Sequence, residues 1–318
     1  MRKQRRQLRG FTLLDMLWSV ITIALLVALL LPAVQSTRER ARRISCENNL
    51  RQLGVALAQY QQLHGLLPPG SVSSHQPVTW LQPSSGISWL AQIMPQLGES
   101  AIWQQVHAED PFLSFSAYRQ DPDPTMMPRA DTSTEPGAER MVFYPVVSIL
   151  RCPSFGGAWS ANSGLTNYAA CHHSREQPIS EDGDGMFSVN SSESLEHIPD
   201  GRSTTLLVGE ISSGLQGHGW VFGDRTVLRN GDTLASEESS SMVSNMQNLA
   251  LEGDTEADRL KTRELSDQVG PFGSSHAYHV NFLLADGSVR PLAKTIDPLL
   301  LRSLISKADS LPLGDGGF

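Results

Sequence analysis

Cysteine and basic residues are both scarce in this 318-residue chain. Its three cysteines, Cys46, Cys152 and Cys171, form no CxxC pair and lack the paired Cys/His spacing of a structural zinc site. Twenty-five basic residues face 33 acidic ones, which gives a net charge of −8. Nucleic-acid binding usually requires a basic face that neutralises phosphates. The acidic balance therefore excludes nucleic acid as an expected partner.

The short motifs of common enzyme classes are also missing. The chain has no GxSxG elbow, HExxH pair, Walker phosphate loop or dinucleotide-binding fingerprint. Glu210 is a candidate catalytic carboxylate, but no second acid accompanies it at a defined spacing. We therefore expect that the protein is not an enzyme and that it has no catalytic residues.

Long apolar sequence, by contrast, is present at the N-terminus. A basic leader, residues 1–10, precedes the run Phe11–Leu31, in which Asp15 is the one charged residue. A run of this length matches the roughly 20 residues that cross a bilayer as a helix. We expect residues 11–32 to be transmembrane, with the leader's five positive charges on the cytoplasmic side and the remainder outside. Four arginines between residues 38 and 43 follow the apolar run and reduce the difference in positive charge between its two ends.

Three fates of this segment remain open from the residues alone. The run could be cleaved near Ala33 as a conventional signal peptide, retained as an unprocessed anchor, or cut in front of the apolar core. The position of Gly10, in GFTLLDMLWSVI, resembles the type III signal of prepilins. This resemblance implies that a prepilin peptidase cuts after Gly10 and that the new N-terminal Phe11 is methylated. Removal of the leader would leave 20 basic and 33 acidic residues, a net charge of −13.

Asp15 would then be the fifth mature residue, a position that is usually Glu in prepilins. In pilins this acid is thought to pair with the N-terminal amine of a neighbouring subunit, and a carboxylate in lipid is costly unless it is paired. The alternative is a tolerated polar residue near the helix end. Pro32 closes the apolar run, as a proline does in pilins. We assign Asp15 and Pro32 to assembly.

The helix is expected to continue through residues 33–66 as an amphipathic segment that ends near His64. Its apolar stripe recurs at spacings of three, four and six residues. The members of the stripe are Ile44, Leu50, Leu53, Leu57, Tyr60 and Leu63. The sequence LLPPG, residues 66–70, then stops the helix.

Several motifs along the chain point to one family. They are LLLPAVQ, ARR…C.NNL.QLG.AL and PPG near the N-terminus, RCPS at 151–154, TNYA at 166–169, GMF at 185–187, DGRSTTLLVGE at 200–210, and His276-x9-Asp286-Gly287. The chain is similar to a family of planctomycete type IV pilin-like proteins that carry a domain of unknown function. The resemblance implies an assembly role outside the cytoplasm and no known activity. The chain departs from the family in polar insertions near 117–140 and 232–268, and at His279, where the family more often has glycine.

Cys46 and Cys152 both lie in motifs of the resembled family. If the domain is exported, a disulfide between them would tie the helix to the domain. The alternative is two buried, unpaired thiols. Cys171 would stay free in either case.

The extracytoplasmic globular domain is expected over residues 67–318. Strand candidates are Val142–Leu150, Thr204–Val208, Gly219–Phe222, Val280–Leu284 and Ser288–Leu292. Ala285-Asp286-Gly287 would form the tight turn of a hairpin, and Asp297 would cap a closing helix within Thr295–Lys307. The expected fold class is α+β and pilin-like: a long N-terminal helix, half of it transmembrane, packed on an antiparallel sheet with long loops.

Histidines and acids near these turns are candidates for metal sites. His276 and His279 would face opposite sides of an extended segment, so we expect no zinc site there. We interpret His276, Asp286 and Gly287 as structural residues. His276 would fix the loop through hydrogen bonds from its side chain to the backbone. Asp182 and Asp184 resemble part of a calcium loop but lack the bidentate Glu of an EF-hand. A solvated turn is the alternative, and no other cofactor is expected.

The expected function is that of a structural subunit, a type IV pilin-like protein or pseudopilin of a pilus-like or type II secretion-like system. Its partners would be the prepilin peptidase, other pilin-like subunits that contact it through the N-terminal helix, and the membrane. It would be a single-pass protein of the inner membrane. The alternative is a membrane-tethered extracytoplasmic module that binds a solute, a glycan or a surface partner.

Overall fold

The computed structural model describes residues 13–79, 86–108, 146–156, 164–212, 219–235 and 267–308. The chain divides into two compact units, residues 1–44 and 45–318. Gly10, Phe11 and the whole of the predicted insertion 117–140 lie outside the described residues.

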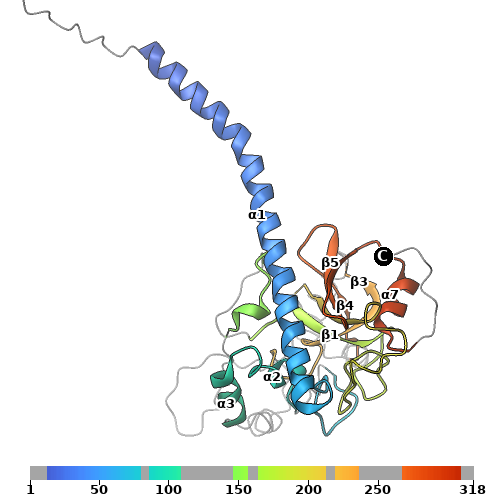
Figure 1. Ribbon diagram of the computed structural model, residues 1–318. Coiled ribbons are helices and arrows are strands. Elements are labelled where there is room, and N and C mark those ends of the chain that lie inside the picture. Colours follow the sequence, from blue (N-terminus) through green and yellow to red (C-terminus); the bar gives the residue numbers. More distant parts are fainter. Residues whose placement is uncertain are drawn as a thin grey trace, which may run out of the picture. The chain divides into compact units, whose positions relative to one another are not determined.

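Helix α1, Leu13–His64, is the longest element and begins in the first unit and ends in the second (Figure 1). Its N-terminal part is rich in Leu, Ala and Ile, and by length and composition it is apolar enough to be a membrane span or a signal anchor. Pro32 lies inside the helix, where it removes one backbone donor. The helix ends at His64 as predicted, because Gly65 takes φ +85° and its N–H donates to the Gln61 carbonyl at 2.7 Å.

The second part of α1 packs into the core of the larger unit. Leu50, Leu53 and Leu57 are fully buried there. The predicted stripe is wrong at its two ends, since Ile44 is 50% and Leu63 is 72% exposed. Each of these lies six residues from its nearest leucine in the stripe, and six residues turn a helix by about 600°, roughly 240° away from the starting face. A residue six positions from a buried leucine therefore points away from the buried face of the helix.

The larger unit contains a six-stranded sheet in the order β4-β3-β1-β2-β5-β6. Its strands are β1 (Tyr168–His173), β2 (Leu206–Glu210), β3 (Leu228–Leu234), β4 (Pro271–Phe272), β5 (His279–Leu284) and β6 (Val289–Ala293). The pairs β1–β2, β2–β5 and β5–β6 are antiparallel, whereas β1–β3 and β3–β4 are parallel. The overall α+β prediction is confirmed, but the sheet is mixed, not antiparallel. The segment between β2 and β3 carries the chain back across the sheet, so β3 runs beside β1 in the same direction.

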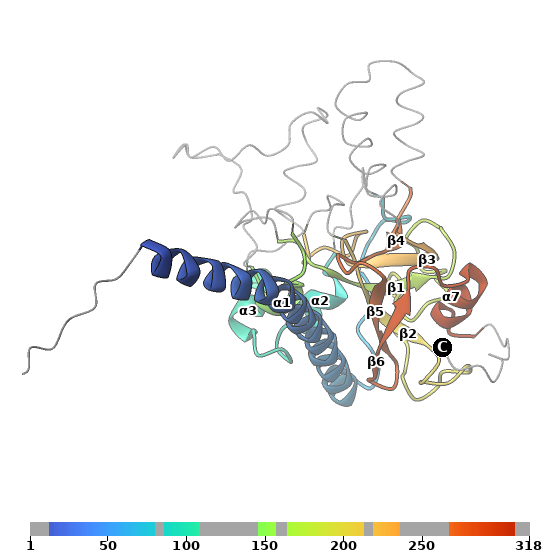
Figure 2. The ribbon, with the colours of Figure 1, turned by 90° about the horizontal axis from the view of Figure 1, so that it is seen from above.

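Both faces of the sheet are covered. Alternate residues of β1 enter two separate apolar clusters: Tyr168 and Ala170 join the cluster that contains the leucines of α1, whereas Ala169 and Cys171 join the other. The second cluster is closed by α7, Pro298–Ile305, which lies beside β3 (Figure 2). The carboxylate of Asp297 accepts from the Leu299 and Leu300 N–H groups at 2.8 and 3.2 Å, which confirms the predicted cap.

The strand predictions succeed best at the C-terminal hairpin. Strands β5 and β6 match the predicted strands to within one residue at each end, and β2 begins two residues later than predicted. Two other candidates are wrong. Residues 219–222 form a turn with a single bridge from Ile87 to Phe222. Of the predicted strand Val142–Leu150, residues 142–145 lie outside the described residues, and Ser148–Leu150 is a short 3-10 helix, η1. Helices α2, Trp89–Gln92, and α3, Ser100–Ala108, complete the described elements.

Candidate functional site

A disulfide joins the second part of α1 to the segment that follows η1. Cys46 and Cys152 are buried, their Cα atoms are 5.1 Å apart, and 106 residues separate them in sequence. Two asparagine side chains bond to the backbone at Arg151 and Cys152. Asn49 Nδ2 donates to the Arg151 carbonyl at 2.9 Å, and the Cys152 N–H donates to Asn167 Oδ1 at 2.8 Å. The backbone around the disulfide is therefore fixed from two directions.

Glu210 lies at the end of β2 as a buried carboxylate with three hydrogen bonds. Its Oε2 accepts from Ser274 Oγ at 2.7 Å and from the Asn281 N–H at 3.1 Å, and its Oε1 accepts from Asn281 Nδ2 at 3.0 Å. Burial alone raises the pKa of this carboxyl, but hydrogen bonds from His276 and Asn281 outweigh it and hold the pKa below its usual value. The site therefore favours the ionised carboxylate.

His276 connects Glu210 to the disulfide. Its Nε2 lies 3.6 Å from Glu210 Oε1 and 3.9 Å from Cys152 Sγ. We call Cys46, Cys152, Glu210 and His276 the Cys–Glu–His centre, because their donor atoms all lie within 4.8 Å of one another and all four residues are buried. The imidazole and the carboxylate can bind a metal ion such as Zn²⁺ as they stand, whereas the two cysteines could do so only as thiolates, after reduction of the disulfide.

The prediction that His276 and His279 point in opposite directions is wrong. Their rings stack with centroids 5.0 Å apart and an interplanar angle of 10°. The reason is local: residues 275–278 form bends rather than an extended strand, so the alternation of faces starts only at His279, where β5 begins. The side chain of His276 also lies close to a carboxylate and a sulfur atom, and its predicted bonds to the backbone stay a prediction.

Asp286 and Gly287, the other part of the His-x9-Asp-Gly signature, shape the turn between β5 and β6. Asp286 Oδ1 accepts from the Ser288 N–H at 2.8 Å, and Gly287 has φ +84°, a conformation that favours glycine. The Asp286 N–H also donates to the Arg202 carbonyl at 3.0 Å. Asp286 and Gly287 therefore serve a turn, and His276 serves the Cys–Glu–His centre.

Sequence reasoning missed several residues that support the centre: Asn49, Tyr168, Ser274 and Asn281. Tyr168 is buried and its hydroxyl oxygen accepts from Asn49 Nδ2 at 3.2 Å. Burial, and next the negative charge of Glu210, raise the pKa of the Tyr168 hydroxyl. A signal for Asn281 existed, because a buried asparagine inside the apolar strand VNFLL requires a polar partner.

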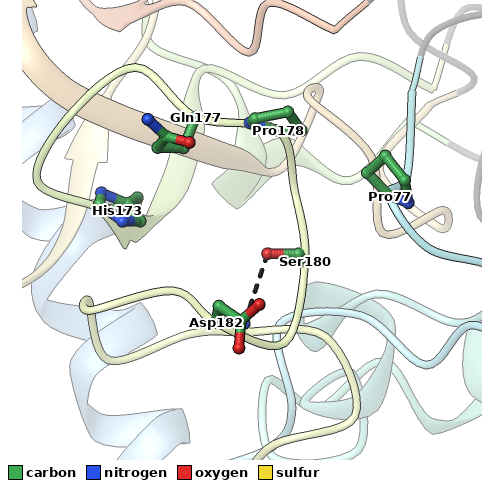
Figure 3. Close-up of a pocket in the computed structure, with 6 residues that line it drawn as sticks. All are labelled: Pro77, His173, Gln177, Pro178, Ser180 and Asp182. Atoms are coloured by element: carbon green, nitrogen blue, oxygen red, sulfur yellow. Dashed lines mark hydrogen bonds between the residues drawn. The ribbon is translucent and has the colours of Figure 1, made fainter.

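The predicted calcium ligands lie in a different region, beside the end of β1. The Asp184 carboxylate accepts from the N–H and the hydroxyl of Ser174 at 2.7 and 2.6 Å, so its two oxygens already fix a turn. Asp182 is exposed and lines a cavity of about 220 Å³ (Figure 3). The other residues around that cavity are Pro77, His173, Gln177, Pro178 and Ser180. Calcium binding here stays a prediction.

Two further buried titratable groups lie on β1. His172 Nδ1 lies 3.0 Å from the Phe187 carbonyl oxygen, and its Nε2 lies 3.2 Å from the Ser180 backbone nitrogen. Burial lowers the pKa of the His172 imidazole. The thiol of Cys171 is free and buried, and burial raises its pKa well above the usual value.

The fold and the site define an α+β protein in which an apolar N-terminal helix continues into a domain built on a mixed sheet with a buried Cys–Glu–His centre. The chain belongs to the family described as a protein of unknown function (DUF1559), which it matches over residues 35–299. That range includes all four residues of the centre and every strand of the sheet. Comparisons with curated proteins and with solved structures find no match.

Proposed function

We propose that this chain is a type IV pilin-like structural subunit of the kind that carries a C-terminal His-x9-Asp-Gly signature. A prepilin peptidase would cut it after Gly10, and the mature subunit would assemble in a pilus-like or type II secretion-like system through its N-terminal helix. The domain would lie outside the cytoplasm, anchored in the inner membrane or held in a filament.

The observation that carries this proposal is the apolar surface of α1. The N-terminal part of the helix exposes large apolar side chains on every side. Contact of this surface with water would be unfavourable, so the helix requires lipid or neighbouring helices around it. These residues are Leu13, Leu14, Met16, Leu17, Trp18, Val20, Ile21, Ile23, Leu25, Leu26, Val27, Leu29, Leu30, Leu31 and Val34. The same helix then enters a folded domain without a linker, so one element serves both as anchor and as core.

Two further features support the proposal. Asp15 lies in α1 within the apolar segment, where a carboxylate is stabilised by a cationic partner such as the amine of a processed Phe11 in a neighbouring subunit. The Cys46–Cys152 disulfide agrees with a domain that matures in an oxidising compartment.

The direct test is intact-mass and N-terminal peptide analysis of the protein purified from its native membrane. A mature chain that begins with methylated Phe11 is the expected result. A chain that retains residues 1–10, or one that is cut near Ala33, would rule out the proposed processing.

Assembly is tested separately by cross-linking between subunits in that membrane. Asp15→Ala should abolish helix-to-helix cross-links, whereas Asp15→Glu should retain them because the charge is kept. Thr22→Val is the matched control. The Thr22 hydroxyl already bonds to the Trp18 and Ser19 carbonyls of its own helix at 3.0 and 2.9 Å, so its loss should leave assembly unchanged. Equal cross-linking in Asp15→Ala would contradict the assembly role.

A further inference from the structure

The Cys–Glu–His centre contains the donor set of a zinc site. It offers two sulfurs, one imidazole nitrogen and one carboxylate oxygen, and all four donor atoms lie within 4.8 Å of one another. Structural zinc is bound by four such ligands in a tetrahedron. The ligands come from parts of the described chain that are distant in sequence. Cys46 lies on α1 and Cys152 in the segment after η1, whereas Glu210 ends β2 and His276 lies just before β5.

We propose that the reduced form of this protein binds one Zn²⁺ ion through Cys46, Cys152, Glu210 and His276, and that the disulfide and the zinc site are alternative states of the same centre. A dithiol reduces the disulfide to two thiols and is itself oxidised to a disulfide. Binding of Zn²⁺ then releases the two thiol protons to solvent. The inference does not depend on the pilin-like role.

The distances on the imidazole side fit a tetrahedral ion. With Zn–S near 2.3 Å and Zn–N and Zn–O near 2.1 Å, an S–N edge of the tetrahedron is about 3.6 Å and an N–O edge about 3.4 Å. The corresponding separations are 3.9 Å from Cys152 Sγ to His276 Nε2 and 3.6 Å from His276 Nε2 to Glu210 Oε1. Each is longer than the ideal edge by about 0.3 Å or less, a difference that small side-chain rotations remove. The two sulfurs, which are bonded to each other in the disulfide, must move apart when the ion binds.

The surroundings of Glu210 are those of a held metal ligand. Ser274 and Asn281 donate three hydrogen bonds to its carboxylate, which fixes the direction of Oε1 toward His276. Hydrogen bonds of this kind orient metal ligands, and their loss costs about 10- to 100-fold in metal affinity. The carboxylate is therefore already positioned without the ion.

Binding of the ion adds no net charge to the sulfur pair. Two thiolates and one Zn²⁺ ion sum to zero, which is also the charge of the disulfide that they replace. A net charge is the main electrostatic obstacle to a buried ion.

His276 reaches the centre from a short bend whose other residues face solvent. His276 is the buried residue of the bend at residues 275–278, while Ser275, Ala277 and Tyr278 are exposed, Tyr278 to 84%.

The test uses the full chain in detergent micelles. The protein is reduced with dithiothreitol in denaturant, refolded anaerobically with ZnCl₂, desalted, and analysed for bound zinc and for free thiols. The expected result is one Zn²⁺ per chain in the reduced protein and none in a sample that is oxidised before zinc is added. X-ray absorption should show two sulfur ligands at about 2.3 Å and two nitrogen or oxygen ligands at about 2.0–2.1 Å.

Variants assign the ligands. His276→Ala and Glu210→Ala should each weaken zinc binding about tenfold or more, and Asn281→Ala should weaken it about 10- to 100-fold. Cys171→Ser is the matched control, because Cys171 is a buried thiol on β1 outside the centre, and it should bind zinc as the wild type does.

Three outcomes would overturn the proposal: a reduced chain that binds no zinc, an oxidised chain that binds it equally well, or an absorption spectrum with a different number of sulfur ligands. The spectrum of the wild type decides the matter even if a variant fails to fold.

Discussion

The buried imidazole of His172 predicts a defined dependence of stability on pH. In the neutral form, Nδ1–H donates to the Phe187 carbonyl oxygen and Nε2 accepts from the Ser180 N–H. Protonation converts Nε2 into a donor that faces the Ser180 N–H, with the Pro178 carbonyl oxygen 3.4 Å away as its acceptor, and it places a charge in a buried site. The groups that face this ring electrostatically are His173, which opposes the charge, and Asp184, which favours it. Burial has the largest effect and lowers the pKa of His172.

The magnitude follows from proton linkage. The unfolded chain binds a proton at His172 near the ordinary histidine pKa of 6.5, whereas the folded chain does so only at a lower pH. Stability is therefore complete above pH 6.5 and falls below it until the folded imidazole titrates. The free energy of unfolding should therefore fall between about pH 7.5 and about pH 5.5 through this residue, by at most about 1.4 kcal/mol, the limit for an imidazole that stays neutral in the folded chain.

Replacement of His172 by glutamine isolates this contribution. His172→Gln keeps an acceptor near the Ser180 N–H and cannot be protonated, but it loses the bond to the Phe187 carbonyl. We expect a cost of about 1 kcal/mol at about pH 7.5, and a loss of stability on acidification that is smaller than that of the wild type, by at most about 1.4 kcal/mol over the same interval.

Urea unfolding at pH steps between these limits measures the effect, followed by the fluorescence of tryptophans that include the fully buried Trp89 and Trp220. His197→Gln is the matched control, since its side chain is exposed, and it should keep the slope of the wild type. If the wild type and His172→Gln lose stability in parallel as the pH falls, the reasoning about His172 is refuted.

Three further predictions concern stability at neutral pH, measured by the same urea unfolding. Cys46→Ser removes a disulfide that spans 106 residues. The free energy of unfolding should fall by about 5 kcal/mol if the bond acts by restricting the entropy of the unfolded chain. A fall below about 2 kcal/mol would show that the disulfide constrains the unfolded chain little. Gly209→Ala would push a methyl group against the Phe282 ring and should cost about 1–3 kcal/mol, and wild-type stability would disprove this close approach. Leu53→Ala should cost about 2–5 kcal/mol and Leu63→Ala less than about 0.5 kcal/mol, because only Leu53 is buried; equal effects would contradict the packing of α1.

Local signals predicted much of the fold. The end of α1, the turn at Asp286 and Gly287, and the cap at Asp297 all depend on residues within a few positions of one another, and each lies where the sequence indicates. The direction of β3 could not be predicted in this way. A parallel partner for β1 depends on the path of the long segment between β2 and β3, and no local pattern encodes that path.

The candidate site could be predicted only in pieces. The sequence offers Cys46 and Cys152 as a possible disulfide, with two unpaired thiols as the alternative, and it offers His276 and Glu210 only as separate candidates. His276 lies 124 residues from Cys152 in sequence, and their meeting requires the whole sheet to be in place. The bend at 275–278 is a second reason why the stacking of His276 on His279 was not predicted. If the same residues formed an extended strand, the two side chains would lie on opposite faces.

The wide sequence separation of the centre has a consequence for biosynthesis. Because the chain is made from its N-terminus, Cys46 is ready long before Glu210 and His276 exist, and the strands that close the sheet come last. Contacts this distant along the chain slow folding and leave apolar surface uncovered in the meantime. A ribosome that stalls before residue 276 would therefore release a chain whose first and last core elements never meet. Such incomplete chains should be degraded by proteases, because their apolar core stays exposed.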